Sequence, residues 1–383
     1  VVYFPKFSHP DPSVKRKSGF LNPTWKDSTN LGLSIDLPYF YAISDNKDLT
    51  FKPRFYFNDE LILQNEYRQV NKNSNHVVDF SFNTNNYLSS NRLLKTHLFS
   101  NSIFETNFEN FDNSNFEINF ETVSNDTYLK TYKIDSPLVK NESLLNSYIS
   151  FNAENEDLLF STSLEVYNDL SKDKTDRYEF IYPNYKLEKY IDLDSESLQA
   201  LDISSYGHQK KYATNIYEGI IINDLLFKGN NNIFNWGLKN NFNAVIKNVN
   251  KKGKNSAIYK ENFDQSLLSV FTINNEFPLK KLGINYESNF TPKISLMYSP
   301  NKTINNSNDD RRIDVGNVYD LNRLGYSDTV EGGASITVGS EYRRSSNKTG
   351  SELVSFNLAT VLRKSKNEDL PIISTIGNTA SDI

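Results

Sequence analysis

The feature that most constrains this chain is a strict alternation of apolar and polar residues along many segments. In residues 31–37, Leu, Leu, Ile and Leu occupy the odd-numbered positions, and Gly, Ser and Asp occupy the even-numbered ones. The same period recurs at residues 49–57, where Lys52 and Arg54 alternate with apolar residues. A period of two indicates β-strands that have one apolar and one polar face. We therefore predict an all-β, antiparallel fold with about 13 to 15 strands of about 8 to 12 residues each.

The segments between these runs are polar and lack alternation. Those at residues 193–211, 251–256 and 301–310 are rich in Asn, Ser, Asp and Lys. Such composition is typical of exposed connections, so we predict loops there. No segment shows the 3.6-residue period of an amphipathic helix.

Two architectures use long alternating strands: a soluble β-sandwich or solenoid, and an outer-membrane β-barrel. Hydrophobic residues make up 37% of the chain, below the roughly 45 to 50% of ordinary soluble domains. A barrel strand needs about 9 to 11 residues to cross the hydrocarbon layer, whereas globular strands usually have about 5 to 6. Both observations favour the outer-membrane barrel, because a barrel needs one apolar layer and encloses a wet interior.

Charged residues then predict which face looks inward. Lys52 and Arg54 on one strand lie in phase with Glu66 and Arg68 on the next. A Lys or Arg facing lipid at mid-depth costs about 2 to 4 kcal/mol. We therefore predict that Lys52, Arg54, Glu66 and Arg68 belong to the luminal face.

Composition also excludes several classes of function. With 42 basic and 47 acidic residues the net charge is −5, which gives no general attraction to nucleic acid. The chain has no Cys, and its four His are scattered without ligand spacing, so no metal site, cofactor site or catalytic motif is predicted. The longest apolar run, residues 37–43, is far shorter than the roughly 20 residues of a membrane helix.

Particular residues resemble a known family. The opening of the chain, the segments that follow it and several segments near the other end are similar to the LptD, or organic solvent tolerance, family of LPS-assembly proteins. The segments that carry the resemblance are residues 3–12, 15–23, 37–40, 48–54 and 66–68, then residues 292–300, 321–325, 328–333 and 371–382.

The resemblance implies an organisation and a location. Residues 1–18 would be the end of a periplasmic jelly-roll domain and its junction, and residues 19–383 the N-terminal part of a transmembrane β-barrel. The chain would then be a fragment that supplies the first half of a barrel of about 26 strands. The implied location is the cell outer membrane, and no enzymatic activity is implied.

The resemblance also implies a function and partners. The implied function is an outer-membrane translocon that inserts lipopolysaccharide into the outer leaflet through a lateral gate between the first and last strands. The implied partners are lipopolysaccharide, the lipoprotein plug LptE, the periplasmic bridge protein LptA, outer-membrane lipids and the barrel-assembly machinery.

Two prolines and one basic cluster are the candidate site residues. Proline has no backbone donor and weakens strand pairing, and in the family prolines of the first two strands weaken the gate, so Pro23 and Pro38 are the predicted gate residues. Pro23 beginning a strand and Pro38 ending one is the plainer alternative. Lys15, Arg16 and Lys17 precede the first strand and would contact lipid A phosphates at the periplasmic mouth, although a solvated turn is the simpler explanation of this cluster.

Two other classes of function stay open. One is a different outer-membrane barrel, such as a porin or a receptor. The other is a soluble β-rich binding module, in which the phenylalanines would point into a compact core and the charges into water.

Overall fold

The structure is a computed structural model of the 383-residue chain. It describes residues 16–28, 31–57, 60–84, 95–139, 141–193, 195 and 197–371. Lys15 therefore lies outside the described residues. Within the described part, no helix has the length and apolar character needed to cross a membrane.

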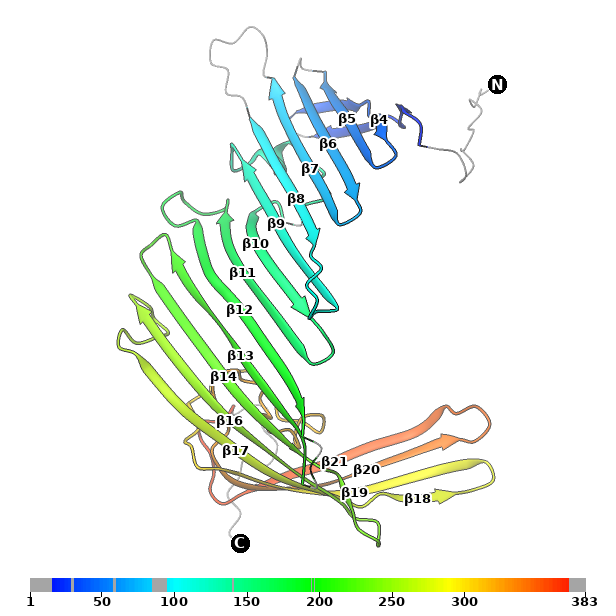
Figure 1. Ribbon diagram of the computed structural model, residues 1–383, viewed down its shortest axis with the longest axis vertical. Helices are drawn as coiled ribbons and strands as arrows, with labels where there is room; N and C mark the ends of the chain where they lie inside the picture. Colours follow the sequence, from blue (N-terminus) through cyan, green and yellow to red (C-terminus); the bar gives the residue numbers. More distant parts are fainter. Residues whose placement is uncertain are drawn as a thin grey trace. The chain divides into compact units, whose positions relative to one another are not determined.

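The described residues form 21 β-strands and one short α-helix (Figure 1). The strands are β1 (Gly19–Phe20), β2 (Thr24–Ser28), β3 (Gly32–Asp36), β4 (Tyr39–Ser44), β5 (Lys47–Tyr56), β6 (Leu61–Asn71), β7 (Ser74–Thr84), β8 (Thr96–Glu105), β9 (Asn113–Val123), β10 (Leu144–Glu154), β11 (Leu158–Asp169), β12 (Tyr178–Asp192), β13 (Leu198–Tyr212), β14 (Tyr217–Gly229), β15 (Asn232–Ile233), β16 (Lys239–Lys254), β17 (Asp264–Glu276), β18 (Leu279–Leu282), β19 (Tyr286–Ser299), β20 (Gly333–Ser346) and β21 (Glu352–Arg363). The helix, α1, is Tyr128–Tyr132.

The all-β, antiparallel class predicted from the alternation is confirmed. Fifteen of the described strands have ten or more residues, and the other six are short. The prediction of about 13 to 15 strands matches the number of long strands among the described residues. The short strand β3 lies within the alternating residues 31–37, whereas β1, β15 and β18, with two to four residues, are too short to show a period. Long strands with alternating faces are consistent with the wall of an outer-membrane β-barrel.

The chain divides into two compact units. Unit 1 comprises Val1–Asn155, Ser161–Asn184 and Lys210–Ile216, and unit 2 comprises Glu156–Phe160, Tyr185–Gln209 and Tyr217–Ile383. In unit 1, β4 to β10 pair in chain order, each with the next. In unit 2, β14 pairs with β16, then β16 with β17, β17 with β19, β19 with β20 and β20 with β21.

Two sequence predictions need correction. Residues 193–211 were expected to form a loop, yet β13 occupies Leu198–Tyr212. This strand lacks a clear alternation of apolar and polar residues, because its polar side chains find partners on neighbouring strands. Asp202 pairs with Lys228 at 2.5 Å, and Ser205 donates to Asn223 at 2.7 Å. Likewise β16 continues to Lys254, into the predicted loop 251–256, whereas residues 301–310 do form a connection without strands.

The helix α1 was not predicted. It has five residues, and its side chains Tyr128, Leu129 and Tyr132 are buried. Together with Tyr56, Ile62, Phe99, Ile134, Leu145 and Leu170 they form the apolar cluster of unit 1. One helical turn is too short for a periodic signal, so only its packing reveals it.

Candidate functional site

The two predicted gate prolines lie in adjacent interruptions at one edge of the sheet in unit 1. Pro23 is exposed and lies between β1 and β2, and Pro38 is buried and lies between β3 and β4. From Ser34 to Ala42, across Pro38, β3 and β4 pair with β5 in one continuous register, so they are two parts of a single interrupted strand. In the same way β1 and β2 together form the strand next to it.

The register between these two strands shifts at the prolines. Phe20 pairs with Tyr39, and Thr24 pairs with Asp36. Three residues, 21–23, therefore face only two, 37–38. One extra residue opposite a regular strand is a β-bulge, which disrupts the ladder locally and bends the bulged strand.

Pro38 and a third proline, Pro53 on β5, each remove a ladder hydrogen bond. The Leu21 amide donates to the Pro38 carbonyl at 2.8 Å, and the Leu37 amide donates to the Pro53 carbonyl at 3.0 Å. In a regular antiparallel pair of this kind the opposite residue donates in return. Pro38 and Pro53 have no N–H, so the reciprocal bond is missing from two neighbouring strand pairs at one level of the sheet. We call the contact between two paired strands a seam; the edge seam joins β1 and β2 to β3 and β4, and the next seam joins β3 and β4 to β5.

The basic cluster before β1 is partly held by an acidic partner. The Arg16 Nη1 donates to Asp48 Oδ2 at 2.7 Å, and Arg68 Nε donates to the other oxygen of Asp48 at 2.8 Å. Lys17 is exposed. Of this cluster, Lys17 is thus the described residue best placed to meet a ligand.

The predicted luminal residues do share one face of the sheet. Lys52 lies 3.3 Å from Glu66, and Glu66 lies 3.6 Å from Arg68. Arg54 makes a two-point contact with Asp36, at 2.6 Å through Nε and 3.3 Å through Nη2. We call this side of the strands the polar face and the opposite side the apolar face.

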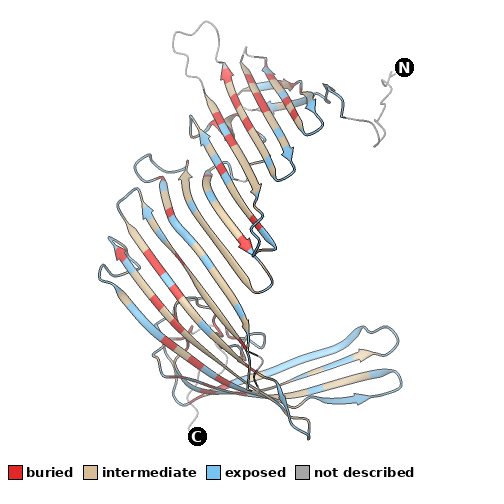
Figure 2. Cartoon of the chain, viewed as in Figure 1, coloured by how far each residue is buried: buried red, intermediate tan, exposed pale blue. Residues whose placement is uncertain are grey.

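Several residues of the polar face are buried and several of the apolar face are exposed, and Figure 2 colours each strand by the burial of its residues. On the polar face Asp79 is 0% exposed and Arg54 5%, whereas Phe51 and Phe55 on the apolar face are 40% and 43% exposed. This is the reverse of a soluble protein, in which charged residues are almost never fully buried and phenylalanines usually are.

Residues 124–139, which connect β9 to β10 and contain α1, cover the polar face of unit 1. The Arg54 guanidinium donates to the Tyr132 carbonyl, and Gln64 donates to the Asp135 carbonyl at 2.9 Å. The Tyr132 hydroxyl donates to Glu60 at 2.6 Å. These contacts supply partners for charged and polar groups that would otherwise be buried alone, which is costly.

An ion pair fixes the start of this covering segment. Arg177, in the connection before β12, donates from both Nη atoms to the Asp126 carboxylate, at 2.9 and 2.8 Å. The Arg177 side chain is buried, and Asp126 is part-exposed. The hydrogen bonds from Arg177 hold the pKa of Asp126 below its usual range.

A Ser–His–Asp cluster that sequence reasoning missed lies under α1. The Ser81 hydroxyl is 2.6 Å from His97 Nδ1, and His97 Nε2 is 3.3 Å from Asp79. All three are buried, and the Tyr128 hydroxyl lies 2.6 Å from Ser81. No signal in the sequence brings these residues together, because their proximity depends on the pairing of β7 with β8. The hydroxyl of Tyr128 occupies the place that a substrate would need, so the cluster supports packing rather than catalysis.

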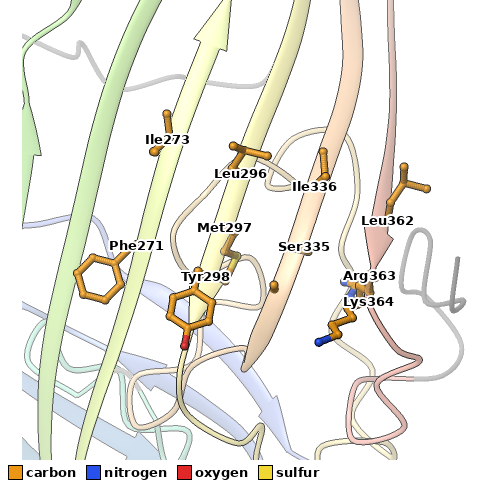
Figure 3. A pocket seen from close by; sticks show the side chains of 11 residues that line it. Phe271, Ile273, Leu296, Met297, Tyr298, Ser335, Ile336, Leu362, Arg363 and Lys364 are labelled. Atoms are coloured by element: carbon orange, nitrogen blue, oxygen red, sulfur yellow. The ribbon is translucent and has the colours of Figure 1, made fainter. Parts of the chain in front are cut away.

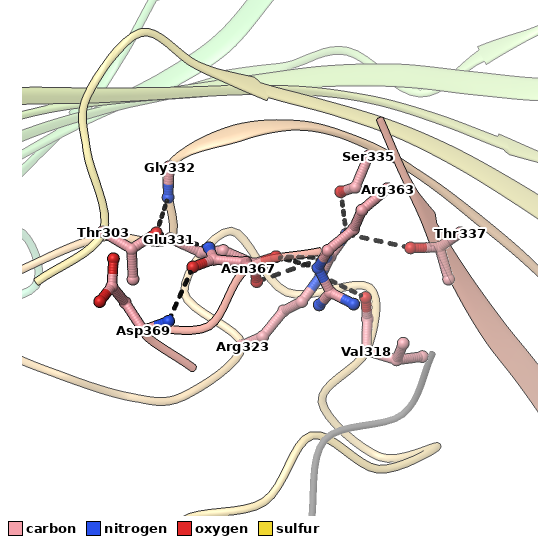
Figure 4. A network of polar contacts seen from close by, with 10 residues as sticks. All are labelled: Thr303, Val318, Arg323, Glu331, Gly332, Ser335, Thr337, Arg363, Asn367 and Asp369. Atoms are coloured by element: carbon pink, nitrogen blue, oxygen red, sulfur yellow. Dashed lines mark hydrogen bonds and ion pairs between the residues drawn. The ribbon is translucent and has the colours of Figure 1, made fainter. Parts of the chain in front are cut away.

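A second covering segment, residues 300–332, lies on the polar face of unit 2. Its centre is a buried network in which Glu331 accepts from Arg323 at 3.3 Å and from Arg363 at 3.0 Å (Figure 4). Arg323 also donates to Ser335 at 3.1 Å and Thr337 at 3.0 Å on β20. Burial lowers the pKa of Arg323, an effect that the charge of Glu331 opposes. Within the described residues, no group of three or more His, Cys, Asp or Glu is placed to hold a metal ion.

The apolar face of unit 2 carries aromatic rows at two levels. One row contains Phe271 and Tyr298, and another contains Phe290, Tyr342 and Phe356. Eight residues separate Tyr298 from Phe290, which is about 26 Å along a strand and about 20 Å across a bilayer for a tilt of about 40°. Aromatic rows that flank an apolar band are expected at the two interfaces of a membrane of about 25 Å apolar height.

Comparisons with known proteins give a partial relationship. No family model matches the chain. LPS-assembly protein LptD of Pseudoalteromonas translucida is 34% identical over 82 residues, which is 21% of this chain and 11% of that protein. LptD of Shewanella oneidensis is 39% identical over 70 residues, or 18% of this chain and 9% of the relative, and LptD of Ralstonia nicotianae is 38% identical over 68 residues, or 18% and 8%. The matched part thus spans about a tenth of the length of these curated relatives.

Among solved structures, a bacterial polysaccharide outer membrane secretin aligns with 69% of this chain and 84% of its own. Its 9% identity and TM-score of 0.25 are too low to indicate a shared fold. The relationship that the comparisons do show is the partial one: about a fifth of this chain is similar to LptD, a protein named for LPS assembly.

Proposed function

We propose that this chain forms part of the wall of an outer-membrane β-barrel that assembles lipopolysaccharide into the outer leaflet. The partial similarity to LptD supports the biological role. The structure supports the physical setting, since the described strands are antiparallel, mostly long and alternate in polarity. The opening of the barrel lies, in this proposal, at the edge strands β1 and β2.

The observation that carries the proposal is the inverted burial of the two faces. Burying a phenylalanine is favourable by about 1.5 to 3 kcal/mol relative to leaving it in water. Large hydrophobic side chains are nevertheless exposed along both units, among them Phe51, Phe55, Phe271, Phe356 and Leu358. Acyl chains remove this penalty, and a soluble binding module would retain it, so the exposed face argues for lipid contact and against the soluble alternative.

The bulge and the missing bonds support a lateral opening at β1 and β2. In hydrocarbon, an unsatisfied backbone group costs several kcal/mol, because no water replaces the lost partner. The seam between the two edge strands contains a register shift and lacks the reciprocal bond of the Leu21–Pro38 pair. Such a seam separates more readily than a regular one, and a lipid with a polar head needs a seam of this kind to pass from the lumen to the bilayer.

The polar face then provides the path and the contacts for partners. The implied partners are lipopolysaccharide, the LptE plug within the lumen, the LptA bridge at the periplasmic end, outer-membrane lipids and the barrel-assembly machinery. Residues 16–18, beside the start of β1, belong in this proposal to the junction with a periplasmic domain. Lys52, Arg54, Glu66 and Arg68 line the lumen. The proposed role involves movement of an intact lipid, without covalent chemistry.

The test is to restore the missing donors in the intact protein within its own outer membrane. In the double substitution Pro23→Ala and Pro38→Ala, the change at position 38 supplies an N–H opposite Leu21, so the pairing of the two edge strands is expected to tighten. Surface lipopolysaccharide, measured by labelling on intact cells, should then fall severalfold while the protein level stays unchanged. Pro53→Ala is the matched control, because it restores a donor toward Leu37 on the next seam, away from the edge.

Each outcome is informative. Loss of surface lipopolysaccharide in the double variant alone supports the gate. Normal transport in the double variant would defeat the gate, and normal lipopolysaccharide in cells that lack the protein would favour a porin or receptor.

A further inference from the structure

A groove lies on the apolar face of unit 2 across β17, β19, β20 and β21 (Figure 3). Its volume is about 440 Å³, within the roughly 300 to 1,000 Å³ of sites that bind small molecules. One wall is a cross-strand row in which neighbouring residues pair directly. That row consists of Ile273, Leu296, Ile336 and Leu362.

A small residue opens the groove in the next row. Phe271 pairs with Tyr298, and Tyr298 pairs with Ala334. Lys364 follows directly after β21 and lies beside Ala334, since the preceding residue Arg363 pairs with Ser335. The small side chain of Ala334 leaves space between the Tyr298 ring on one side and the Lys364 stem on the other. Figure 3 shows the Tyr298 and Lys364 side chains on either side of β20, near Ser335.

Lys364 gives the groove a cationic end. Its side chain is exposed, and no carboxylate of the described residues forms an ion pair with it within 4 Å, in contrast to Lys293, which contacts Glu341 at 2.6 Å. Lysine side chains lay their methylene stem along apolar surface and keep the ammonium at the polar boundary. An apolar groove that ends in such a cation is complementary to an acyl chain with an anionic head group.

Connection lengths place this end in the outer leaflet. The connections at the far end of these strands, residues 283–285 and 347–351, are short, whereas the connection beside the groove is residues 300–332. Outer-membrane barrels have short periplasmic turns and longer extracellular loops. The cationic end of the groove is therefore at the extracellular interface, where phosphate groups of the outer leaflet lie.

We propose that this groove binds a lipopolysaccharide molecule of the outer leaflet from outside the barrel, with an acyl chain between Tyr298 and Leu362 and a phosphate group at Lys364. The inference rests on the membrane placement of the proposed function and is independent of the gate at Pro23 and Pro38. The site is a lipid-facing one, distinct from the polar face. It would hold lipid against the wall rather than conduct it.

Photo-crosslinking tests the site directly. The intact protein is reconstituted into phosphatidylcholine vesicles that contain a minor fraction of lipopolysaccharide, with a benzoylphenylalanine crosslinker at position 298 or, as a control, at position 356 at the other aromatic row. The expected result is preferential crosslinking of lipopolysaccharide at position 298 and of phosphatidylcholine at position 356. Lys364→Ala should reduce the lipopolysaccharide adduct at position 298 about fivefold, the effect of one basic residue at a membrane surface.

A filling substitution provides a second, independent variant. Ala334→Trp occupies the groove and should abolish most of the lipopolysaccharide adduct. Val338→Trp lies on the same face of the same strand, outside the residues that line the groove, and should leave the adduct unchanged.

The outcomes separate this inference from the proposed function. Lipid adducts at both positions in bulk proportion, unaffected by Lys364→Ala, would overturn the groove and leave the membrane placement intact. No lipid adduct at either position would overturn the membrane placement itself.

Discussion

Arg54 and Lys52 lie two positions apart on the polar face of β5, and their side chains are buried to different extents. The Arg54 side chain is 6% exposed and pairs with Asp36, whereas the Lys52 side chain is 32% exposed and pairs with Glu66. Arg54 also bonds to the carbonyl of Tyr132 in α1. The sequence predicts that both side chains point to one face. The burial of Arg54 comes from its contact with the covering segment, which the sequence pattern does not predict.

This difference predicts unequal effects of removing each charge. Arg54→Met leaves Asp36 buried and the Tyr132 carbonyl without its donor, so it should destabilise the protein by about 3 to 5 kcal/mol. Lys52→Met removes a part-exposed pair and should cost about 0 to 1 kcal/mol. Unfolding by urea in lipid vesicles measures both variants. Equal losses for the two substitutions would contradict the burial of Arg54.

At the scale of elements, the Asp126–Arg177 ion pair is a pH-sensitive anchor of the covering segment 124–139. Pairing with Arg177 lowers the pKa of Asp126 from its ordinary value of 3.8. A carboxyl with a lowered pKa in the folded state contributes stability that is present above the unfolded value, and the contribution is lost as pH falls through the folded value. The anchor should therefore hold at neutral pH and weaken progressively as the pH falls below about 4, toward the lower folded value.

Hydrogen exchange tests this anchor. The amides of residues 128–134 should exchange faster at about pH 3 than at about pH 6, after correction for the intrinsic pH dependence of exchange. Asp126→Asn should raise exchange at the higher pH and remove most of the difference between the two conditions. The amides of β6 serve as an internal reference. If α1 kept equal protection in the wild type and the variant at both pH values, the anchor would have no role.

The elements also show which parts of the fold and site are predictable from sequence. Long alternating strands such as β5, β9 and β19 are predictable, because their faces meet different surroundings along their whole length. β13 was missed, since cross-strand partners satisfy polar side chains such as Asp202 and Ser205 on a strand without clear alternation. The contacts of α1 and the Arg323–Glu331–Arg363 network depend on strand register and on connections folding back, which no local pattern records.

The candidate site divides in the same way. Pro23 and Pro38 are visible as strand-breaking residues, but their common level and the one-residue bulge appear only when the pairings of β1 to β5 are known. Lys52, Arg54, Glu66 and Arg68 share one face, which a period of two predicts without tertiary information; that this face is luminal stays a prediction. The gate itself and the basic contact at Arg16 and Lys17 stay predictions.

At the scale of the whole molecule, the apolar face predicts that substitutions on it depend on their depth in a bilayer. Val338 lies near the middle of β20 between the two aromatic rows, and Ser346 ends the same strand on the same face. In a bilayer, Val338→Arg should destabilise by about 2 to 4 kcal/mol and Ser346→Arg by about 0 to 1 kcal/mol, since the cost of a charge depends on depth.

Unfolding equilibria in lipid vesicles measure this gradient, and the same two variants in detergent-free buffer provide the contrast. A depth-independent effect, or a protein that stays folded and monomeric without lipid or detergent, would contradict the assignment of this face to acyl chains.

The two covering segments have a consequence for leakage. Each is a connection between neighbouring strands, and each lies on the polar face of its own unit, held by Arg54 and Arg177 in one case and by the pairing of Glu331 with two arginines in the other. Each covering segment is part of the same chain as the strands that it covers. In the proposed barrel, antibiotics and other small solutes would therefore meet a partly filled interior, and a large lipid would have to displace these segments or pass beside them.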